Sequence, residues 1–164
     1  ADIVICGTGW HQRCAFLPPD IMAKVTDDRG NFRLYRSMLP VGVPRLAFNG
    51  YNSSFFSQLN AEVSALWLAD MLMGGVALPD AATANAYIDR RLAWMEQRTG
   101  GKHSKGTNII PFSVHHMDEL LEEIDLQIPR TTRLKHWFVA INARDYAPLV
   151  TRLLKRHGIA EARI

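Results

Sequence analysis

The chain has 164 residues, of which 48% are hydrophobic and 21% charged, and its formal net charge is +3. This length supports one domain with its own core, and the composition is typical of a globular protein. Lysine and arginine are scattered along the chain, so the charge does not indicate a nucleic-acid-binding surface. Cys6 and Cys14 are too few for a disulfide framework and lack metal-ligand spacing, which favours reduced thiols in a cytoplasmic protein.

The first predicted element is a buried strand at the start of the chain. Residues 3–6 form a short apolar run that stops at Gly7, Thr8 and Gly9. Such a run, bounded by glycines, is typical of a strand inside a parallel sheet, where it has a neighbour on each side. We therefore expect sequence upstream of residue 1 to supply the partners of this strand.

The segment that follows is predicted to consist of short strands and turns. The proline pair at residues 18–19 argues against a helix, so residues 21–25 are expected to form a strand. A turn at residues 27–31 would join it to a strand at residues 32–35, which makes a hairpin. A further short strand is expected at residues 45–49.

A long buried helix is predicted after residue 50. It is apolar nearly all round, ends at the glycine pair 74–75, and begins at one of four polar residues, which are Asn52, Ser53, Ser54 and Ser57. Its most apolar stretch, residues 65–78, is interrupted by Asp70 and is shorter than the ~20 residues that a membrane span requires. We therefore expect a core helix rather than a membrane-spanning one.

Three further helices are predicted in the second half of the chain. Their expected N-caps are Asp80, Ser113 and Asp145. Their expected ends are the glycine pair 100–101, the breaker segment 125–129, and Gly158.

Few of the residue types that carry catalysis occur in a recognisable pattern. His115 and His116 lie beside four acidic residues, but a helical zinc site has histidines four residues apart, so a solvated helix face is predicted and no metal site. Residues 100–108 lack the order of a phosphate-binding loop, and no serine lies in a G-x-S-x-G turn. We assign no catalytic acid, base or nucleophile.

One candidate binding site lies between residues 46 and 60. A predicted strand runs through Gly50 and a polar stretch into the start of the long helix. This arrangement brings free backbone N–H groups and the positive end of a helix to one point, which suits an anionic or electron-rich ligand. The residues equally allow Gly50 to be a simple turn and Asn52 a simple helix cap.

Three consecutive stretches resemble segments of the flavin-containing monooxygenase family. ADIVICGTGW, followed by FLP, resembles a strand that ends in Ala-Thr-Gly-aromatic, although Gly7 and Trp10 replace the usual Ala and Tyr or Phe. FRLYRSMLPVGVPRLAFNGY resembles a Leu-Tyr, Pro and Pro-x-Leu run that precedes a glycine. NAEVSALWLADMLMGGVALP resembles a helix with a central Trp that is followed by Gly and Leu-Pro. Order and spacing agree over residues 1–80.

The resemblance implies an α/β flavoprotein with two dinucleotide-binding domains, one for FAD and one for NADPH. The chain has neither of the G-x-G-x-x-G motifs that such domains carry, so the resemblance implies the C-terminal portion. Residues 1–80 would be the C-terminal part of the FAD domain with the linker strand from the NADPH domain. Residues 81–164 would be a helical region packed on it. The upstream portion of the same enzyme would be the partner.

The resemblance also implies which residues lie near the cofactor. Thr8 and Gly9 would belong to the linker motif between the domains. The helix that begins near Ser57 would point its N-terminus at the pyrimidine side of the flavin. The residues expected to face the isoalloxazine ring are Asn52, Ser53, Ser54 and Phe55, with Gln58 as a further ring contact or pocket wall, and Gly50 is expected to be a cofactor-binding residue.

The implied reaction inserts one oxygen atom from O2 into a soft nucleophile, an amine or a sulfide, through a flavin C4a-hydroperoxide. The flavin carries this chemistry, so the chain alone, without its upstream portion, would be inactive. A Baeyer–Villiger-type monooxygenase acting on ketones is a second hypothesis. A third is a non-catalytic interaction domain that has kept only the C-terminal fold. The sequence leaves the substrate and the oligomeric state open, a homo-oligomer included.

Overall fold

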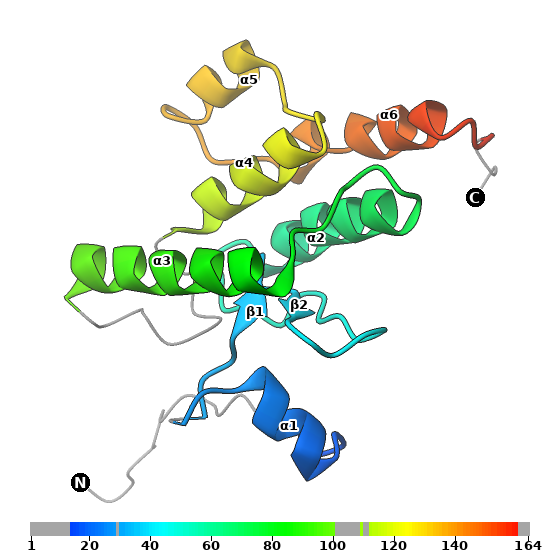
Figure 1. Ribbon diagram of the computed structural model, residues 1–164. Coiled ribbons are helices and arrows are strands. Elements are labelled where there is room, and N and C mark those ends of the chain that lie inside the picture. The colour runs from blue at the N-terminus through cyan, green and yellow to red at the C-terminus, as the bar shows by residue number, and fades with distance from the viewer. Residues whose placement is uncertain (1–13, 29, 101–108, 110–111, 161–164) are drawn as a thin grey trace, which may run out of the picture.

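The computed structural model describes residues 14–28, 30–100, 109 and 112–160, and this part of the chain is mostly helical (Figure 1). Its helices are α1 (Pro19–Val25), α2 (Ser57–Leu72), α3 (Ala81–Thr99), α4 (Ser113–Glu123), α5 (Arg130–Lys135) and α6 (Pro148–Arg156). Its other elements are the strands β1 (Leu34–Tyr35) and β2 (Leu39–Pro40) and the 3₁₀ helix η2 (Ala143–Asp145). The architecture is compatible with a piece of an α/β protein. The predicted first strand at residues 3–6 lies outside the described residues.

Helix α1 corrects the prediction of a strand at residues 21–25. Pro19 does not prevent the helix, because it occupies the first turn, where a backbone N–H has no partner to lose. The fixed φ angle of proline already suits a helix at that position. The proline pair therefore marks the start of a helix.

The turn at residues 27–31 is confirmed, but the strand pairing differs from the prediction. The Asp27 N–H donates to the Asn31 carbonyl over 2.9 Å, and Thr26 and Phe32 form an isolated bridge. The partner of β1 is β2, which pairs with it in antiparallel register. Residues 45–49 do not form the predicted strand, and Arg45 has a φ of 62°, which no strand residue adopts.

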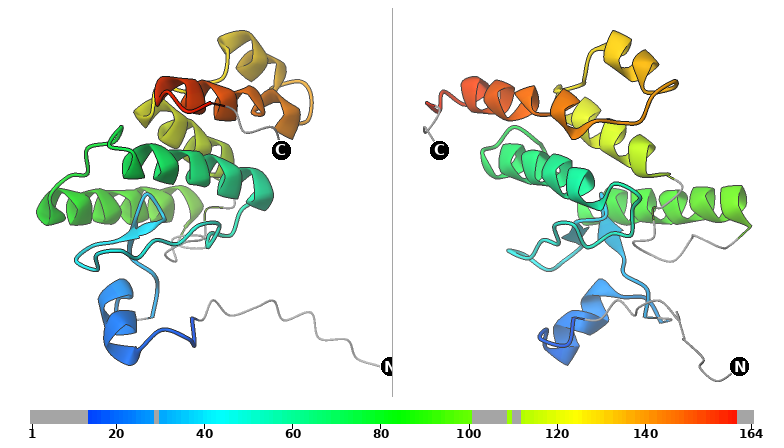
Figure 2. Two further views of the ribbon diagram at one scale, coloured as in Figure 1. Left: turned by 90° about the vertical axis from the view of Figure 1, so that its right-hand side faces the viewer. Right: turned by 180° about the vertical axis from the view of Figure 1, so that it is seen from behind.

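Helices α2, α4 and α6 run in roughly the same direction, with α3 beside them in the opposite direction (Figures 1 and 2). Near the N-terminal end of α2, the Ser54 hydroxyl lies 2.9 Å from that of Ser113, the first residue of α4. Near the other end, Trp67 Nε1 donates to Glu123 Oε2 over 2.8 Å. These two contacts fix α2 and α4 as parallel neighbours with their N-termini together.

The main hydrophobic core lies between these helices and the two-stranded sheet. Trp67 is fully buried at its centre, and its ring lies 6.4 Å from that of Tyr35 on β1. Other buried members of this core are Met38, Val63, Ile88, Met117, Leu120, Leu121, Leu149 and Leu153. Two smaller clusters lie under α1 and at the C-terminal end of α3. In the described ranges no helix is long and apolar enough to cross a membrane.

Of the N-caps predicted for the three later helices, the structure confirms one, and the N-cap of α2 is Phe56 rather than one of the four polar residues predicted for it. The Asp80 carboxylate accepts the Thr83 N–H over 2.7 Å, as a cap of α3 does. Ser113 is instead the first residue inside α4, and its hydroxyl contacts Ser54. Asp145 lies in η2 and binds His136 Nε2 over 2.8 Å, while α6 begins after Ala147 without a side-chain cap. The side chains of Ser113 and Asp145 therefore contact Ser54 and His136 and do not cap these two helices.

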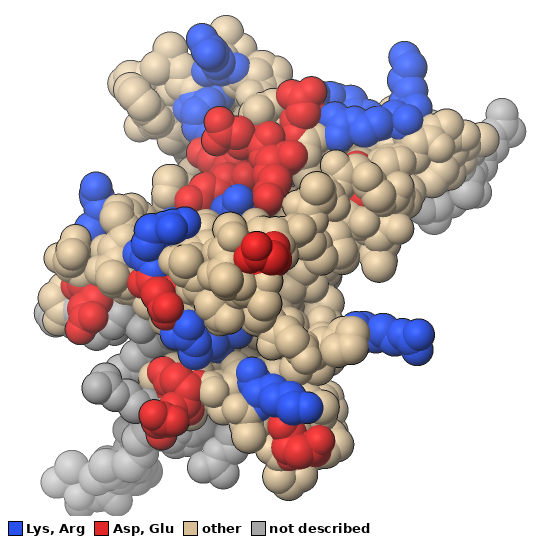
Figure 3. Space-filling model, viewed as in Figure 1, with Lys and Arg blue, Asp and Glu red and all other residues tan. Residues whose placement is uncertain are grey.

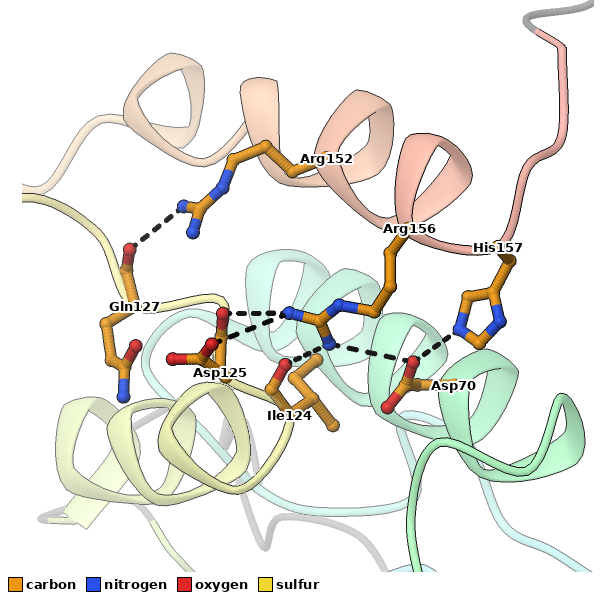
Figure 4. Close-up of polar contacts among 7 residues, drawn as sticks. All are labelled: Asp70, Ile124, Asp125, Gln127, Arg152, Arg156 and His157. Atoms are coloured by element: carbon orange, nitrogen blue, oxygen red, sulfur yellow. Dashed lines mark hydrogen bonds and ion pairs between the residues drawn. The ribbon is translucent and has the colours of Figure 1, made fainter.

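Cations gather at the C-terminal ends of the parallel helices (Figure 4). The Arg156 guanidinium donates to the carbonyls of Ile124 and Asp125, just past the end of α4. Arg152 donates to the Gln127 carbonyl over 3.1 Å. Arginine on the last carbonyls of a helix satisfies their lone pairs and offsets the negative end of its dipole.

A buried carboxylate completes this end of the molecule (Figure 4). Asp70, on the last turn of α2, is only 1% exposed, and its Oδ1 lies 2.6 Å from His157 Nε2 and 3.8 Å from Arg156 Nη1. Gly75 packs so closely on this carboxylate that a Cβ there would overlap it. Asp70 therefore ties α6 to α2.

A second ion-paired cluster joins β1 to α2, α3 and α4. Glu123 accepts from Trp67, lies 2.9 Å from Arg36 Nε and accepts from the Tyr35 hydroxyl over 3.3 Å. The Arg36 guanidinium also lies over the Tyr87 ring, 4.6 Å from its centroid. The acidic side chains gathered over α4 in Figure 3 are thus only partly the solvated face that the sequence predicts.

We expect Glu123→Gln to lower the free energy of unfolding by about 2–3 kcal/mol, because it leaves the mostly buried Arg36 side chain without a counter-charge. Urea unfolding would measure the change. The matched control is Glu122→Gln on the exposed side of α4, for which a change within about 0.5 kcal/mol is expected. Equal effects of the two substitutions would contradict this role of Glu123.

Candidate functional site

The candidate site lies where α2 and α4 begin. Neither helix has a side-chain cap or an acidic residue in its first turn. Because the two helices are parallel, the positive ends of their dipoles lie close together. This end of the pair can therefore receive an anionic or electron-rich group.

Ser54 positions both helix ends. Its hydroxyl accepts from the Phe56 N–H over 3.1 Å and from Asn60 Nδ2 over 2.8 Å, and lies 2.9 Å from Ser113 Oγ. Ser113 Oγ in turn accepts the Phe55 N–H over 3.2 Å. These bonds turn the Ser54 side chain inward, so Ser54 organises the site rather than forming its surface.

The other predicted site residues differ in their exposure. Phe55 is 75% exposed, and Gln58 and Gly50 also lie at the surface. Ser53 is half-buried, and its carbonyl accepts the Ile109 N–H over 3.0 Å. Thr8 and Gly9 lie outside the described residues. The structure thus brings residues 50–58 together as one segment that leads into α2.

Asn52 and Gly50 have features that a binding segment requires. Asn52 is 4% exposed, and neither atom of its side-chain amide has a partner among the described residues. A buried amide without partners costs free energy, so such a group is normally satisfied by something else. Gly50 has a φ of 68°, and a Cβ there would lie 3.1 Å from that of Ala61, so the chain approaches α2 closely.

An open groove of about 550 Å³ lies beside the two helix ends. Its wall is part aromatic and part charged, and consists of Phe55, Phe56, Ser113, Val114, His115, Asp118, Arg133 and Trp137. Asp118 and Arg133 pair with each other, so neither presents a free charge. The groove offers aromatic surface next to the positive helix ends.

The residues that α4 and the segment after α5 bring to this groove are not predicted from the sequence. Ser113 is 59 positions from Ser54, and no local sequence pattern predicts their contact. Trp137 and Phe138 stand in an apolar, aromatic run after α5, and this run is the local signal that the sequence contains. His136 lies between Asp145 and Arg133, and these contacts hold the turn that carries Trp137.

Buried histidine His116 lies on the inner face of α4, three residues after Ser113. Burial lowers its pKa from the ordinary value to about 3, and the positive charges of Arg91, Arg36 and His115 act in the same direction. The neighbouring His115 is half-exposed and lies 3.4 Å from Glu119. His116 is therefore a neutral core residue. In the ranges that the structure describes, no group of three metal-ligating side chains occurs.

Comparison with known proteins identifies monooxygenases as relatives. The chain is 36% identical over 90 residues to a trimethylamine monooxygenase of Roseovarius sp. (strain 217), and the aligned stretch covers 54% of this chain and 20% of that protein. It is 26% identical over 125 residues to a trimethylamine monooxygenase of Roseovarius nubinhibens, and the aligned stretch covers 76% of this chain and 27% of that protein. It is 30% identical over 156 residues to the FAD-dependent monooxygenase DEP4 of Fusarium langsethiae, and the aligned stretch covers 84% of this chain and 25% of that protein.

The chain thus spans about a fifth to a quarter of the length of the curated relatives that it matches. No model of a known protein family matches the sequence, and no solved structure matches it. The similarity supports a relationship to flavin-dependent monooxygenases at most. What the relatives do is a property of those longer proteins.

The lowered pKa of His116 predicts how stability depends on pH. Between the folded value of about 3 and the ordinary value of 6.5, the unfolded chain binds a proton that the folded chain does not. We therefore expect the free energy of unfolding to fall as the pH is lowered below about 6.5.

Urea unfolding between about pH 4.5 and 7.5 tests this expectation. For this one group, the slope of the free energy of unfolding against pH corresponds to the uptake of at most about one proton on unfolding. His116→Gln should lose that part of the slope, whereas His115→Gln on the exposed side should retain it. The expectation would be wrong if both variants kept the slope of the unmodified chain.

Proposed function

We propose that this chain is the C-terminal portion of an FAD- and NADPH-dependent monooxygenase that transfers one oxygen atom from O2 to a small molecule. The substrate in this proposal is a soft nucleophile, an amine or a sulfide. The observation that carries the proposal is the pair of parallel, uncapped helix N-termini behind residues 50–58. The similarity to longer monooxygenases over 54–84% of the chain supports it.

The described residues fit the ring end of a flavin. Reduced flavin carries negative charge on its pyrimidine side, and two positive helix ends stabilise such a charge. Phe55 and Gln58 offer an aromatic surface and an amide at this end, and Gly50 allows a close approach of the backbone. The flavin, when bound, supplies the oxygen chemistry. Residues of this chain would orient the ring and exclude water from the groove beside it.

Within this proposal the predicted site residues have two roles. Phe55, Gln58 and Gly50 would face the ring, and the unpartnered amide of Asn52 would bind a polar edge of the cofactor. Ser54 would be a positioning residue, because its hydroxyl is occupied by α2 and Ser113. The linker role of Thr8 and Gly9, the division at residue 80 and the cytoplasmic location remain parts of the same proposal.

The two alternative functions differ from this one in what they bind or accept. A Baeyer–Villiger-type enzyme would share the flavin but act on a ketone. A non-catalytic interaction domain would bind no flavin, and only the absence of a cofactor from the complete protein would favour it.

The complete reading frame that contains these residues provides the first test. The purified protein is expected to show flavin absorbance and to oxidise NADPH with uptake of O2 in the presence of a tertiary amine or a sulfide. A protein of mass 18.5 kDa that binds no flavin would contradict the proposal. Turnover of ketones alone would favour the Baeyer–Villiger alternative.

Substituting Gln58 tests whether α2 points at the flavin. Gln58→Glu should lower the midpoint potential of the flavin and Gln58→Lys should raise it, each by roughly 6–20 mV, because a charge near a helix end contributes about 0.3–1 kcal/mol. Anaerobic photoreduction with a reference dye would measure both potentials. The matched control is Glu62→Gln, a charge change more than one turn further along the exposed side of α2, which should leave the potential unchanged. Shifts of the same sign in the two Gln58 variants would remove α2 from the flavin site.

A further inference from the structure

Three consecutive residues of the candidate site are hydrogen-bonded to one short segment in the second half of the chain. The Ser53 carbonyl accepts the Ile109 N–H over 3.0 Å. The Ser54 hydroxyl lies 2.9 Å from Ser113 Oγ, and the Phe55 N–H donates to the same oxygen over 3.2 Å. We call the two partners, Ile109 and Ser113, the clamp. Residues expected beside the flavin are thus held by a distant part of the sequence.

The direction of each hydrogen bond at the clamp follows from the donors around the two hydroxyl groups. A serine oxygen has two lone pairs and one proton. Ser54 Oγ already accepts from a backbone N–H and from Asn60 Nδ2, so its own proton is donated to Ser113. Ser113 Oγ accepts this proton and the Phe55 N–H, and its own hydroxyl donates to the Ile109 carbonyl over 3.3 Å. Ser113 is therefore the acceptor on which both Ser54 and Phe55 depend.

The clamp is anchored in the interior, whereas the residue that it holds is at the surface. Ile109 is 1% exposed and Ser113 is 3% exposed, and Ile109 belongs to a buried cluster with Met95 of α3 and Phe112. The Phe112 N–H also donates to the Ile109 carbonyl over 2.8 Å. The Phe55 side chain, by contrast, is exposed and lines the groove beside the two helix ends. A buried support thus fixes the backbone from which an exposed ring projects.

We propose that Ser113 is a positioning residue of the flavin site, and that it acts by holding the backbone of Phe55 where the ring of Phe55 meets the flavin. The inference rests on the proposed function. Ordering one side chain during binding weakens affinity by roughly 2- to 13-fold, and a clamp that orders Phe55 beforehand avoids this loss. Residues 81–164 would then contribute to the site itself, in addition to packing on the preceding part of the chain.

Amide hydrogen exchange at two neighbouring phenylalanines tests the contact. The protein from the complete reading frame is labelled with isotope-enriched phenylalanine and followed by NMR. The Phe55 N–H depends on Ser113, whereas the Phe56 N–H depends on Ser54. We expect Ser113→Ala to speed exchange at Phe55 by roughly 2- to 13-fold, the effect of one lost hydrogen bond, and to leave Phe56 unchanged. Ser54→Ala should give the opposite pattern.

The affinity for FAD tests the role of this contact. Titration of the deflavinated protein should give a dissociation constant for FAD that Ser113→Ala raises by roughly 2- to 13-fold. Ser113→Thr keeps the hydroxyl group, so it should restore both the protection of Phe55 and the affinity. The matched control is Ser64→Ala, which also removes a buried hydroxyl, but one that has no partner among the described residues, and should change neither measurement.

Three results would overturn the role of Ser113. Equal acceleration at Phe55 and Phe56 in Ser113→Ala would indicate general loosening, and equal FAD affinity in Ser113→Ala and Ser64→Ala would separate the contact from the cofactor. A Ser113→Thr protein that regains protection of Phe55 without regaining affinity would do the same. FAD binding by the unmodified protein is measured first, because its absence would contradict the proposed function itself, whereas the three results above contradict only the role of Ser113.

Discussion

The parallel alignment of α2 and α4 is the constraint on which the rest of the structure depends. Parallel neighbours place like ends of their dipoles together, which is unfavourable unless each end finds opposite charge. At the C-terminal ends the chain supplies that charge itself, because Arg156 lies on the last carbonyls of α4 and pairs with Asp70 of α2. At the N-terminal ends the described residues supply no acid and no side-chain cap. Side chains of the molecule therefore offset the dipoles at the C-terminal ends of α2 and α4, whereas the N-terminal ends keep a positive potential that can bind a negative group.

Buried polar contacts between the helices keep this alignment in register. The Ser54–Ser113 contact and the Trp67–Glu123 bond fix α2 against α4 at both ends, and Arg36 extends the second of these to β1. A purely apolar interface would tolerate sliding by one helical turn, whereas each of these groups would lose its partner if the helices slid. The cost of burying them is therefore offset by a single well-defined position for the helix ends.

The sequence predicts the parts of this fold that local patterns determine. The apolar run to residue 73, the Asp80 cap and the glycines at 74 and 100 specify α2 and α3 almost correctly, because their signals lie within one turn of the helix ends. The predictions for Ser113 and Asp145 are wrong, because distant partners occupy both side chains. In the candidate site, residues 50–58 could be selected from their glycine and polar character. The contribution of α4 could not, because nothing local indicates that it runs parallel to α2.

The same geometry limits how this chain can contribute to a reaction. Around the groove, Asp118 is paired with Arg133 and His115 lies 3.4 Å from Glu119, while the nearby His116 is neutral and buried. What the groove offers is fixed positive potential from two helix ends and aromatic surface that excludes water. Such a site suits chemistry that a cofactor performs, because the stabilising groups are backbone dipoles that need no rearrangement when charge appears. The proposed flavin site requires this of the part of its wall that the chain would supply.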